Sequence, residues 1–133
     1  MMNRTCLRAL ATALALAAAL TTGVSSATAA VDKDGILDPG EFGLFCLQNQ
    51  GGAVFDMYTA DANFRDNYFK GSLACAQHTT NDYTESYLNR DTAEWSVYTE
   101  AYRGGYVGFL PAGYRGNAST LYRNTITSAY LEP

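Results

Sequence analysis

The sequence contains little of what enzyme catalysis or metal binding through nitrogen and sulfur usually requires. Its 133 residues include one histidine, three cysteines and one tryptophan. Any Ser–His–Asp triad would have to use His78, which lies in the polar run 77–80 with no nucleophile-elbow pattern nearby. No spacing of histidine and cysteine fits a zinc site, and acidic pairs such as Asp82 and Glu85 are common in surface loops. We therefore expect a protein that is not an enzyme, and His78 to be a surface loop residue.

Basic residues are also scarce. The chain has nine Lys and Arg residues against thirteen Asp and Glu residues. Two of the basic residues, Arg4 and Arg8, belong to the leader described next; without them, seven basic residues face thirteen acidic ones and the net charge is −6. An acidic domain is a poor match for nucleic acid or an anionic membrane. We expect neither as a partner, and we expect a monomer.

The only long apolar run lies near the start of the chain. Residues 9–20 are apolar and rich in Ala and Leu, follow the basic Arg4 and Arg8, and are followed by an Ala-x-Ala pattern at residues 27–30. These three parts make a secretory signal peptide, and the apolar run is shorter than the roughly 20 residues that span a bilayer. We expect residues 1–30 to be removed and residues 31–133 to be secreted as one extracellular domain. A membrane anchor is the less favoured alternative.

Removal of the leader also removes Cys6, so two cysteines remain. In an oxidising compartment, an isolated pair such as Cys46 and Cys75 is most simply a disulfide. Free thiols are the alternative. All ten tyrosines, all six phenylalanines and the single tryptophan lie after the leader, and aromatic residues are enriched in strands. The composition therefore favours a small, disulfide-stabilised β domain.

The sequence after the leader has no long stretch with a helical period. It has short alternating or apolar runs separated by Gly, Asn, Asp and Pro. The pattern predicts strands at 42–47, 53–59, 83–88, 94–100, 106–110 and 126–131, a loop or single helical turn at 61–67, and turns at 51–52, 104–105 and 111–113. Many short strands with frequent turn signals indicate an all-β sandwich or barrel.

A weak internal repeat divides the domain. When Gly51-Gly52 is placed over Gly104-Gly105, Leu44 falls over Val97. Farther on, the polar element Asp82-x-x-x-Ser86 corresponds to Asn124-x-x-x-Ser128. Both halves, at about 41–90 and 94–131, then read as strand, glycine turn, strand, long connection and polar element. Two such halves predict two Greek-key units packed into one sandwich.

The second half carries the features of a known family. Tyr102-Arg103-Gly104 places an aromatic residue two positions before a glycine, and Asn124-x-x-Thr127-Ser128 follows. This pattern resembles a βγ-crystallin Greek-key motif, and the resemblance extends over roughly residues 40–130. It implies an all-β, βγ-crystallin-like sandwich of two Greek-key motifs. The first half departs from the pattern, because Asn49 stands where the aromatic residue is expected.

Together with the signal peptide, the chain length and the Phe45-Cys46-Leu47 strand, the pattern is similar to that of secreted bacterial peptidase inhibitors with this fold. The resemblance implies an inhibitor of an extracellular protease, specifically a metalloproteinase, that acts by occupying the active-site cleft. We expect the inhibitory loop at Leu73, Ala74, Cys75 and Ala76, in the extra length of the first half and tethered by Cys75. A long connection that only covers one end of the sandwich is the alternative for this segment.

The resemblance also suggests one calcium site, although no cofactor is required. Asn81, Asp82, Glu85 and Ser86 supply oxygen ligands, which calcium prefers. Calcium-binding members carry Ser or Thr where this chain has Glu85, and Asn or Asp where the second half has Arg123. A role for the serines in hydrogen bonding across the Greek-key turn is the alternative at this element.

Other functions remain open at this point. The chain could be a calcium-binding or structural extracellular protein without inhibitory activity, or a small secreted toxin. Five tyrosines could form a binding surface for sugars or protein, or could line the core with their hydroxyls at its rim. These are Tyr98, Tyr102, Tyr106, Tyr114 and Tyr122.

Overall fold

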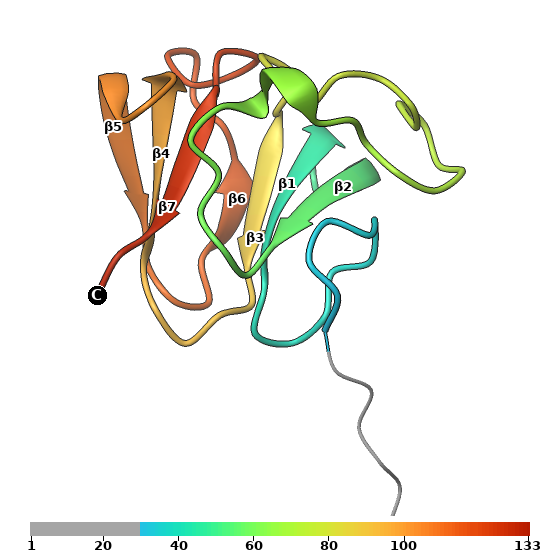
Figure 1. Ribbon diagram of the computed structural model, residues 1–133, viewed down its shortest axis with the longest axis horizontal. Coiled ribbons are helices and arrows are strands. Elements are labelled where there is room, and N and C mark those ends of the chain that lie inside the picture. The colour runs from blue at the N-terminus through green and yellow to red at the C-terminus, as the bar shows by residue number, and fades with distance from the viewer. Residues whose placement is uncertain (1–29) are drawn as a thin grey trace, which may run out of the picture.

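The computed structural model describes residues 30–133. The predicted signal peptide therefore lies outside the described residues, except for its last residue. The described part contains no helix that is long and apolar enough to cross a membrane. It contains seven strands and one short 3-10 helix (Figure 1). These are β1 (Phe42–Leu47), β2 (Gly51–Met57), η1 (Phe64–Asp66), β3 (Ser86–Asn89), β4 (Trp95–Glu100), β5 (Gly104–Leu110), β6 (Arg115–Asn117) and β7 (Ser128–Leu131).

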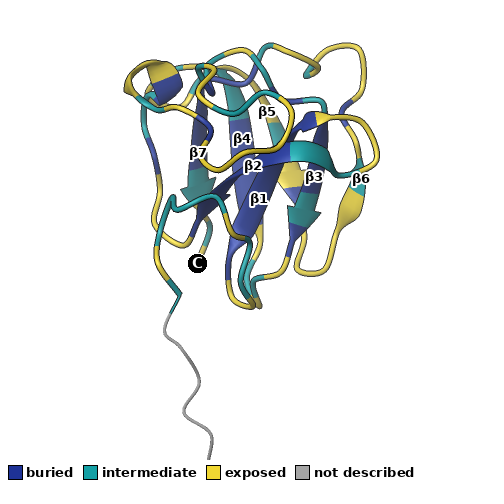
Figure 2. Cartoon of the chain, turned by 90° about the vertical axis from the view of Figure 1, so that its right-hand side faces the viewer, coloured by how far each residue is buried: buried dark blue, intermediate teal, exposed yellow. Residues whose placement is uncertain are grey.

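The strands form two antiparallel sheets that pack face to face, so the predicted all-β sandwich is confirmed. One sheet has the order β2-β1-β3-β6 and the other the order β5-β4-β7. Strands β1, β2 and β3 are mostly buried, whereas β6 and most loops at the two ends are exposed, as Figure 2 shows. Strand β5 is also largely exposed. Phe42 of β1 stacks on Trp95 of β4, with ring centroids 4.9 Å apart, and both side chains are fully buried. The core lies between the sheets, where alternate residues of each strand point inward.

The two halves repeat the same pairing. Phe45 pairs with Val54 in the first hairpin, and Tyr98 pairs with Val107 in the second. Each half also gives one segment to the other half's sheet. Strand β6 of the second half pairs with β3, and Asp61 of the first half forms an isolated bridge with Ala129 in β7. The two hairpins are thus joined into one sandwich by exchanged segments.

The two glycine pairs differ from the prediction, because they begin strands instead of forming the turns. The turns come just before them, where Asn49, Gln50, Tyr102 and Arg103 adopt positive φ. Gly52 has φ +72°, and a Cβ atom there would lie 2.5 Å from the Sγ of Cys46. The pair therefore serves the close approach of two backbones at a β-bulge, for which glycine is suited.

Strand β6 was not predicted, and two predicted strands begin later than expected. Strand β6 is the three-residue run Arg-Gly-Asn, which has no apolar alternation to reveal it. The segments before β3 and β7 bond to one another instead: Asp82 N–H donates to the Ile126 carbonyl at 3.0 Å, and Asn124 N–H donates to the Thr84 carbonyl at 2.8 Å. This reciprocal contact joins segments that are far apart in the sequence, so the pattern of neither segment alone predicts it.

Candidate functional site

The loop at residues 69–79, named the tethered loop below, projects from one end of the sandwich. In Figure 1 it is the yellow-green segment at the upper right, well away from the strands of the second sheet. A disulfide joins Cys75 in this loop to Cys46 in β1, as predicted, with the two Cα atoms 6.5 Å apart. Ala53 N–H of β2 donates to the Ala74 carbonyl at 2.9 Å. The loop is therefore fixed to the first hairpin by one covalent and one hydrogen bond.

Hydrogen bonds within the tethered loop close its base and shape its tip. Phe69 N–H donates to the His78 carbonyl at 2.9 Å, and Gln77 N–H donates to the Phe69 carbonyl at 2.8 Å. Near the tip, Ala76 N–H donates to the Leu73 carbonyl at 3.0 Å, so residues 73–76 form a turn. Cys75 and Gln77 have φ values of +74° and +72°, which gives the loop a defined and irregular path.

The four residues of the predicted inhibitory segment are presented unequally. Leu73 is 64% exposed, and Ala74 beside it is also exposed. Cys75 and Ala76 are half-buried against the domain. The segment therefore offers one large apolar side chain to solvent at a turn. His78 lies exposed in the same loop and stacks on Tyr83, with ring centroids 3.9 Å apart.

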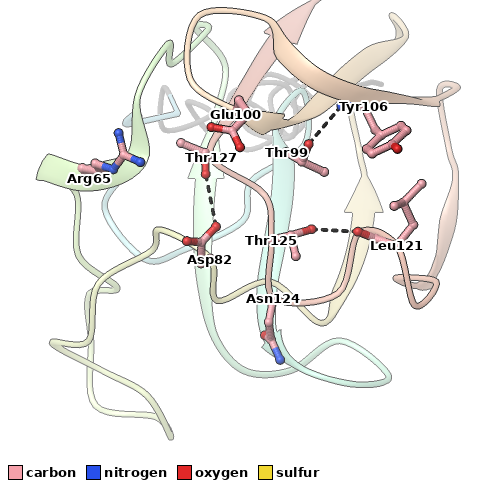
Figure 3. Close-up of a pocket in the computed structure, with 9 residues that line it drawn as sticks. All are labelled: Arg65, Asp82, Thr99, Glu100, Tyr106, Leu121, Asn124, Thr125 and Thr127. Carbon is pink, nitrogen blue, oxygen red and sulfur yellow. Dashed lines mark hydrogen bonds between the residues drawn. The ribbon is translucent and has the colours of Figure 1, made fainter.

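A pocket of about 390 Å³ lies where the Greek-key turns of the two halves meet (Figure 3). Thr127 donates its hydroxyl hydrogen to Asp82 Oδ1 at 3.2 Å across this pocket. Glu100 adds a second carboxylate and Arg65 a guanidinium to the lining. The remaining lining residues are Thr99, Tyr106, Leu121, Asn124 and Thr125. The pocket is polar and open, with charges of both signs.

The four residues predicted to bind calcium make contacts within the protein. Ser86 donates to the Leu47 carbonyl at 2.6 Å and accepts from Gln50 N–H at 2.9 Å. Asn81 donates to the Asp82 carboxylate at 3.1 Å. The serine thus makes the hydrogen bonds across the Greek-key turn that were the alternative to metal binding, and Ser128 of the second half likewise donates to the Glu100 carbonyl at 2.8 Å.

Glu85, the fourth residue of this set, pairs with Arg123, with its Oε1 atom 3.4 Å from the arginine Nε. That cation stands beside the carboxylate that the metal would need, and like charges repel. In the described residues, no group of three or more His, Cys, Asp or Glu side chains is gathered so as to hold a metal ion. The buried Oδ1 atom of Asn81 has no hydrogen-bond partner among the described residues, and the calcium site at this element stays a prediction.

The five tyrosines singled out above do not share one environment. Tyr102 and Tyr106 are 73% and 64% exposed, whereas Tyr122 donates its hydroxyl hydrogen to the Val107 carbonyl at 2.6 Å. Tyr98 packs edge-on against Tyr130 and accepts from Arg103 at 3.0 Å. Tyr114 lies near Tyr87, which belongs to β3 of the four-stranded sheet.

Two buried carboxyl groups, Glu41 and Asp56, were not found from the sequence. Both are fully buried, on the outer face of the four-stranded sheet and beneath the segment that precedes β1. The pKa of Glu41 is raised to about 7 by burial and by the nearby carboxylates of Asp56, Asp38 and Asp34, against the opposing hydrogen bond from the Asp38 backbone. Burial likewise raises the pKa of Asp56. Two signals were available in the sequence: the acidic residue inside the alternation of β2, and the spacing of acidic residues over 32–41.

Comparison with known proteins identifies the fold. No family model matches the chain, and no curated protein matches it. A solved structure described as "Evolution of the eye lens beta-gamma-crystallin domain fold" matches with a TM-score of 0.57 and 14% identity, over 79% of this chain and 93% of that one. The fold is that of a βγ-crystallin domain.

This match confirms the predicted fold class. At 14% identity the likeness concerns the fold alone, because one fold hosts many functions. Function has to be argued from the tethered loop and from the carboxyl groups.

Proposed function

We propose that this protein is a secreted peptidase inhibitor whose tethered loop enters the active-site cleft of an extracellular metalloproteinase. The observation that carries the proposal is the exposure of Leu73 on a loop that a disulfide ties to a core strand. A binding loop that is already ordered loses less conformational entropy when it is captured. The choice of a metalloproteinase rests on the family resemblance of the sequence.

The turn at residues 73–76 favours blockage of the cleft over binding as an extended substrate. In a turn the carbonyl of Leu73 is bonded within the loop, to Ala76 N–H, and is not free to pair with a protease strand. The Leu73 side chain is available to fill an apolar specificity pocket. The base of the loop and the disulfide would keep the chain in place while the cleft is occupied.

The test is a titration of the oxidised protein against a panel of metalloproteinases and serine proteases, following residual activity and the integrity of the inhibitor. We expect a stoichiometric loss of activity of a metalloproteinase while the protein stays uncut. Leu73→Ser should weaken inhibition strongly. Leu121→Ser is the matched control, because Leu121 is also exposed, at 45%, but lies outside the loop.

Two results would reject the proposal. Full protease activity across the panel would leave the fold without an inhibitory role. Equal inhibition by the wild type and the Leu73 variant would show that the tethered loop is not the inhibitory element.

A further inference from the structure

The segment before β1, residues 31–40, folds back over the outer face of the four-stranded sheet. In Figure 1 it is the blue and cyan segment beside β2. Its Leu37 side chain packs so closely on Gly43 that a Cβ atom there would lie 2.7 Å from the Leu37 Cδ2 atom. Gly43 pairs with Asp56 across the sheet, and Glu41, two residues before Gly43, points to the same face. The segment therefore covers two carboxyl groups that lie diagonally on one sheet face.

The backbone of the covering segment bonds directly to these carboxyl groups. Asp56 accepts from Asp34 N–H at 3.0 Å and from Gly35 N–H at 2.7 Å. Glu41 accepts from Asp38 N–H at 2.7 Å through its Oε2 atom. The other oxygen, Oε1, is buried and has no hydrogen-bond partner among the described residues. A buried carboxyl oxygen without a partner is costly, so this oxygen requires a proton, a water molecule or an ion.

No cation compensates the charge of this cluster. None of the ion pairs among the described residues involves Asp34, Asp38, Glu41 or Asp56. Three basic side chains beside the segment bond elsewhere: Lys33 pairs with Asp61, Lys70 donates to the Lys33 carbonyl at 3.2 Å, and the Arg90 guanidinium donates to the Leu37 carbonyl. Four carboxyl groups thus lie near one another without a compensating cation, although their side chains do not converge on one point.

The spacing of the acidic residues has a known chemical meaning. The run Asp32-x-Asp34-Gly35, followed by five residues and Glu41, matches all but the first position of a twelve-residue calcium loop, in which Gly forms the sharp turn and Glu closes the site. Gly35 has φ +90°. The missing first position falls on Ala30, and Asp56 from β2 supplies a carboxylate to the same loop amides.

We propose that Asp34, Asp38, Glu41 and Asp56 bind one calcium ion between the sheet and the covering segment, with the Ile36 carbonyl as a further oxygen ligand. Glu41 and Asp56 are already in place beneath the segment. The described side chains do not yet converge around a metal ion, so the half-buried carboxylates of Asp34 and Asp38 turn inward when calcium binds.

Asp32, at a ligand position of the sequence pattern, has a different role in this chain. Its carboxylate accepts from Tyr58 N–H at 2.7 Å and from the Thr59 hydroxyl at 2.7 Å. It fastens the start of the covering segment to the end of β2. Extracellular calcium modules have dissociation constants of about 10⁻⁴–10⁻³ M, and we expect this site to fall in that range.

The test is a calcium titration of the oxidised, chelator-treated protein by calorimetry, with amide NMR shifts followed in parallel. We expect one ion per chain, shifts at Gly35 and Ile36, and a melting temperature that rises with calcium. Asp38→Asn should weaken calcium binding at least about tenfold. The Asp38 side chain makes no hydrogen bond to the described residues, so this substitution leaves the fold intact.

Glu94→Gln is the matched control, because Glu94 is exposed and lies outside both candidate calcium sites, so its loss should leave calcium binding unchanged. Absence of heat and of amide shifts at 10 mM calcium, a concentration about tenfold above the upper expected dissociation constant, would overturn the inference. Binding that Asp82→Asn abolishes and Asp38→Asn does not change would also overturn it. The inference is independent of protease inhibition, since no protease is needed to observe it.

Discussion

Breaking the disulfide between Cys46 and Cys75 should destabilise the protein by about 3.6 kcal/mol. The two cysteines are 29 residues apart in the sequence. In the chain-entropy model, closing a loop of that length lowers the entropy of the unfolded chain by about 12 cal/mol/K, which corresponds to about 3.6 kcal/mol at 25 °C. For a domain of this size, each kcal/mol shifts the melting temperature by about 4–8 °C, so we expect a loss of about 15–30 °C.

The measurement is urea unfolding of the oxidised protein and of the Cys46→Ala/Cys75→Ala double variant. Trp95 is the only tryptophan and is fully buried on Phe42, so its fluorescence reports the core directly. The m value of the variant would show whether its unfolded state is more expanded without the cross-link. Wild-type protein with the disulfide reduced should behave as the variant does.

A loss below about 1 kcal/mol would refute this reasoning. It would mean that the unfolded chain is already compact around the first hairpin, so that the cross-link removes little entropy from it. The variant also separates stability from binding. If the core remains folded while inhibition is lost, the covalent tether is needed to order Leu73.

Three further predictions concern single positions. Asn89→Ala should cost about 2–4 kcal/mol in urea unfolding, because it removes the hydrogen bonds of a buried amide to the Ala93, Leu110 and Pro111 carbonyls. Gly105→Ala should cost about 1–3 kcal/mol by the same measurement, since φ is +73° and the added Cβ would collide with Thr99 Oγ1; Gly113→Ala, with φ +82° and open space around it, should cost less. In chelator, the stabilisation from protonated Glu41 should be complete below pH 4.5 and be lost as pH rises through about 7, since the pKa is raised from 4.5 to about 7 on folding. The free energy of unfolding should fall by about 3 kcal/mol over this pH range. Glu41→Gln should flatten this part of its pH profile, and an equally steep profile in the variant would contradict the assignment of the fall to Glu41.

The parts of the fold that were predictable are those in which local pattern and tertiary role agree. The alternation in β4 identified the strand because Trp95 and Val97 bury one face of it. The cysteine pair was predictable because only two cysteines follow the predicted signal peptide. Strand β6 was not, because Arg115 and Asn117 are exposed and only backbone pairing with β3 makes the segment a strand.

The candidate sites divide in the same way. Leu73 could be singled out because it lies in the extra length of the first half, beside a cysteine. The burial of Glu41 and Asp56 depends on a segment that returns over the sheet from outside the repeat, and the sequence pattern of a strand carries no information about such a cover. The role of Glu85 likewise depends on Arg123, which lies in the other half of the chain.

The exchange of β6 and Asp61 between the halves has a consequence for how the chain can be divided. The sheet of the first half needs β6 of the second half to be complete, and the sheet of the second half is bridged by Asp61 of the first half. The molecule resembles a dimer with swapped arms whose two subunits have been joined into one polypeptide. Cutting the connection between β3 and β4 would therefore produce two fragments that are each incomplete but that can reassociate into one sandwich. We therefore expect the whole sandwich to be the smallest part of the chain that folds by itself.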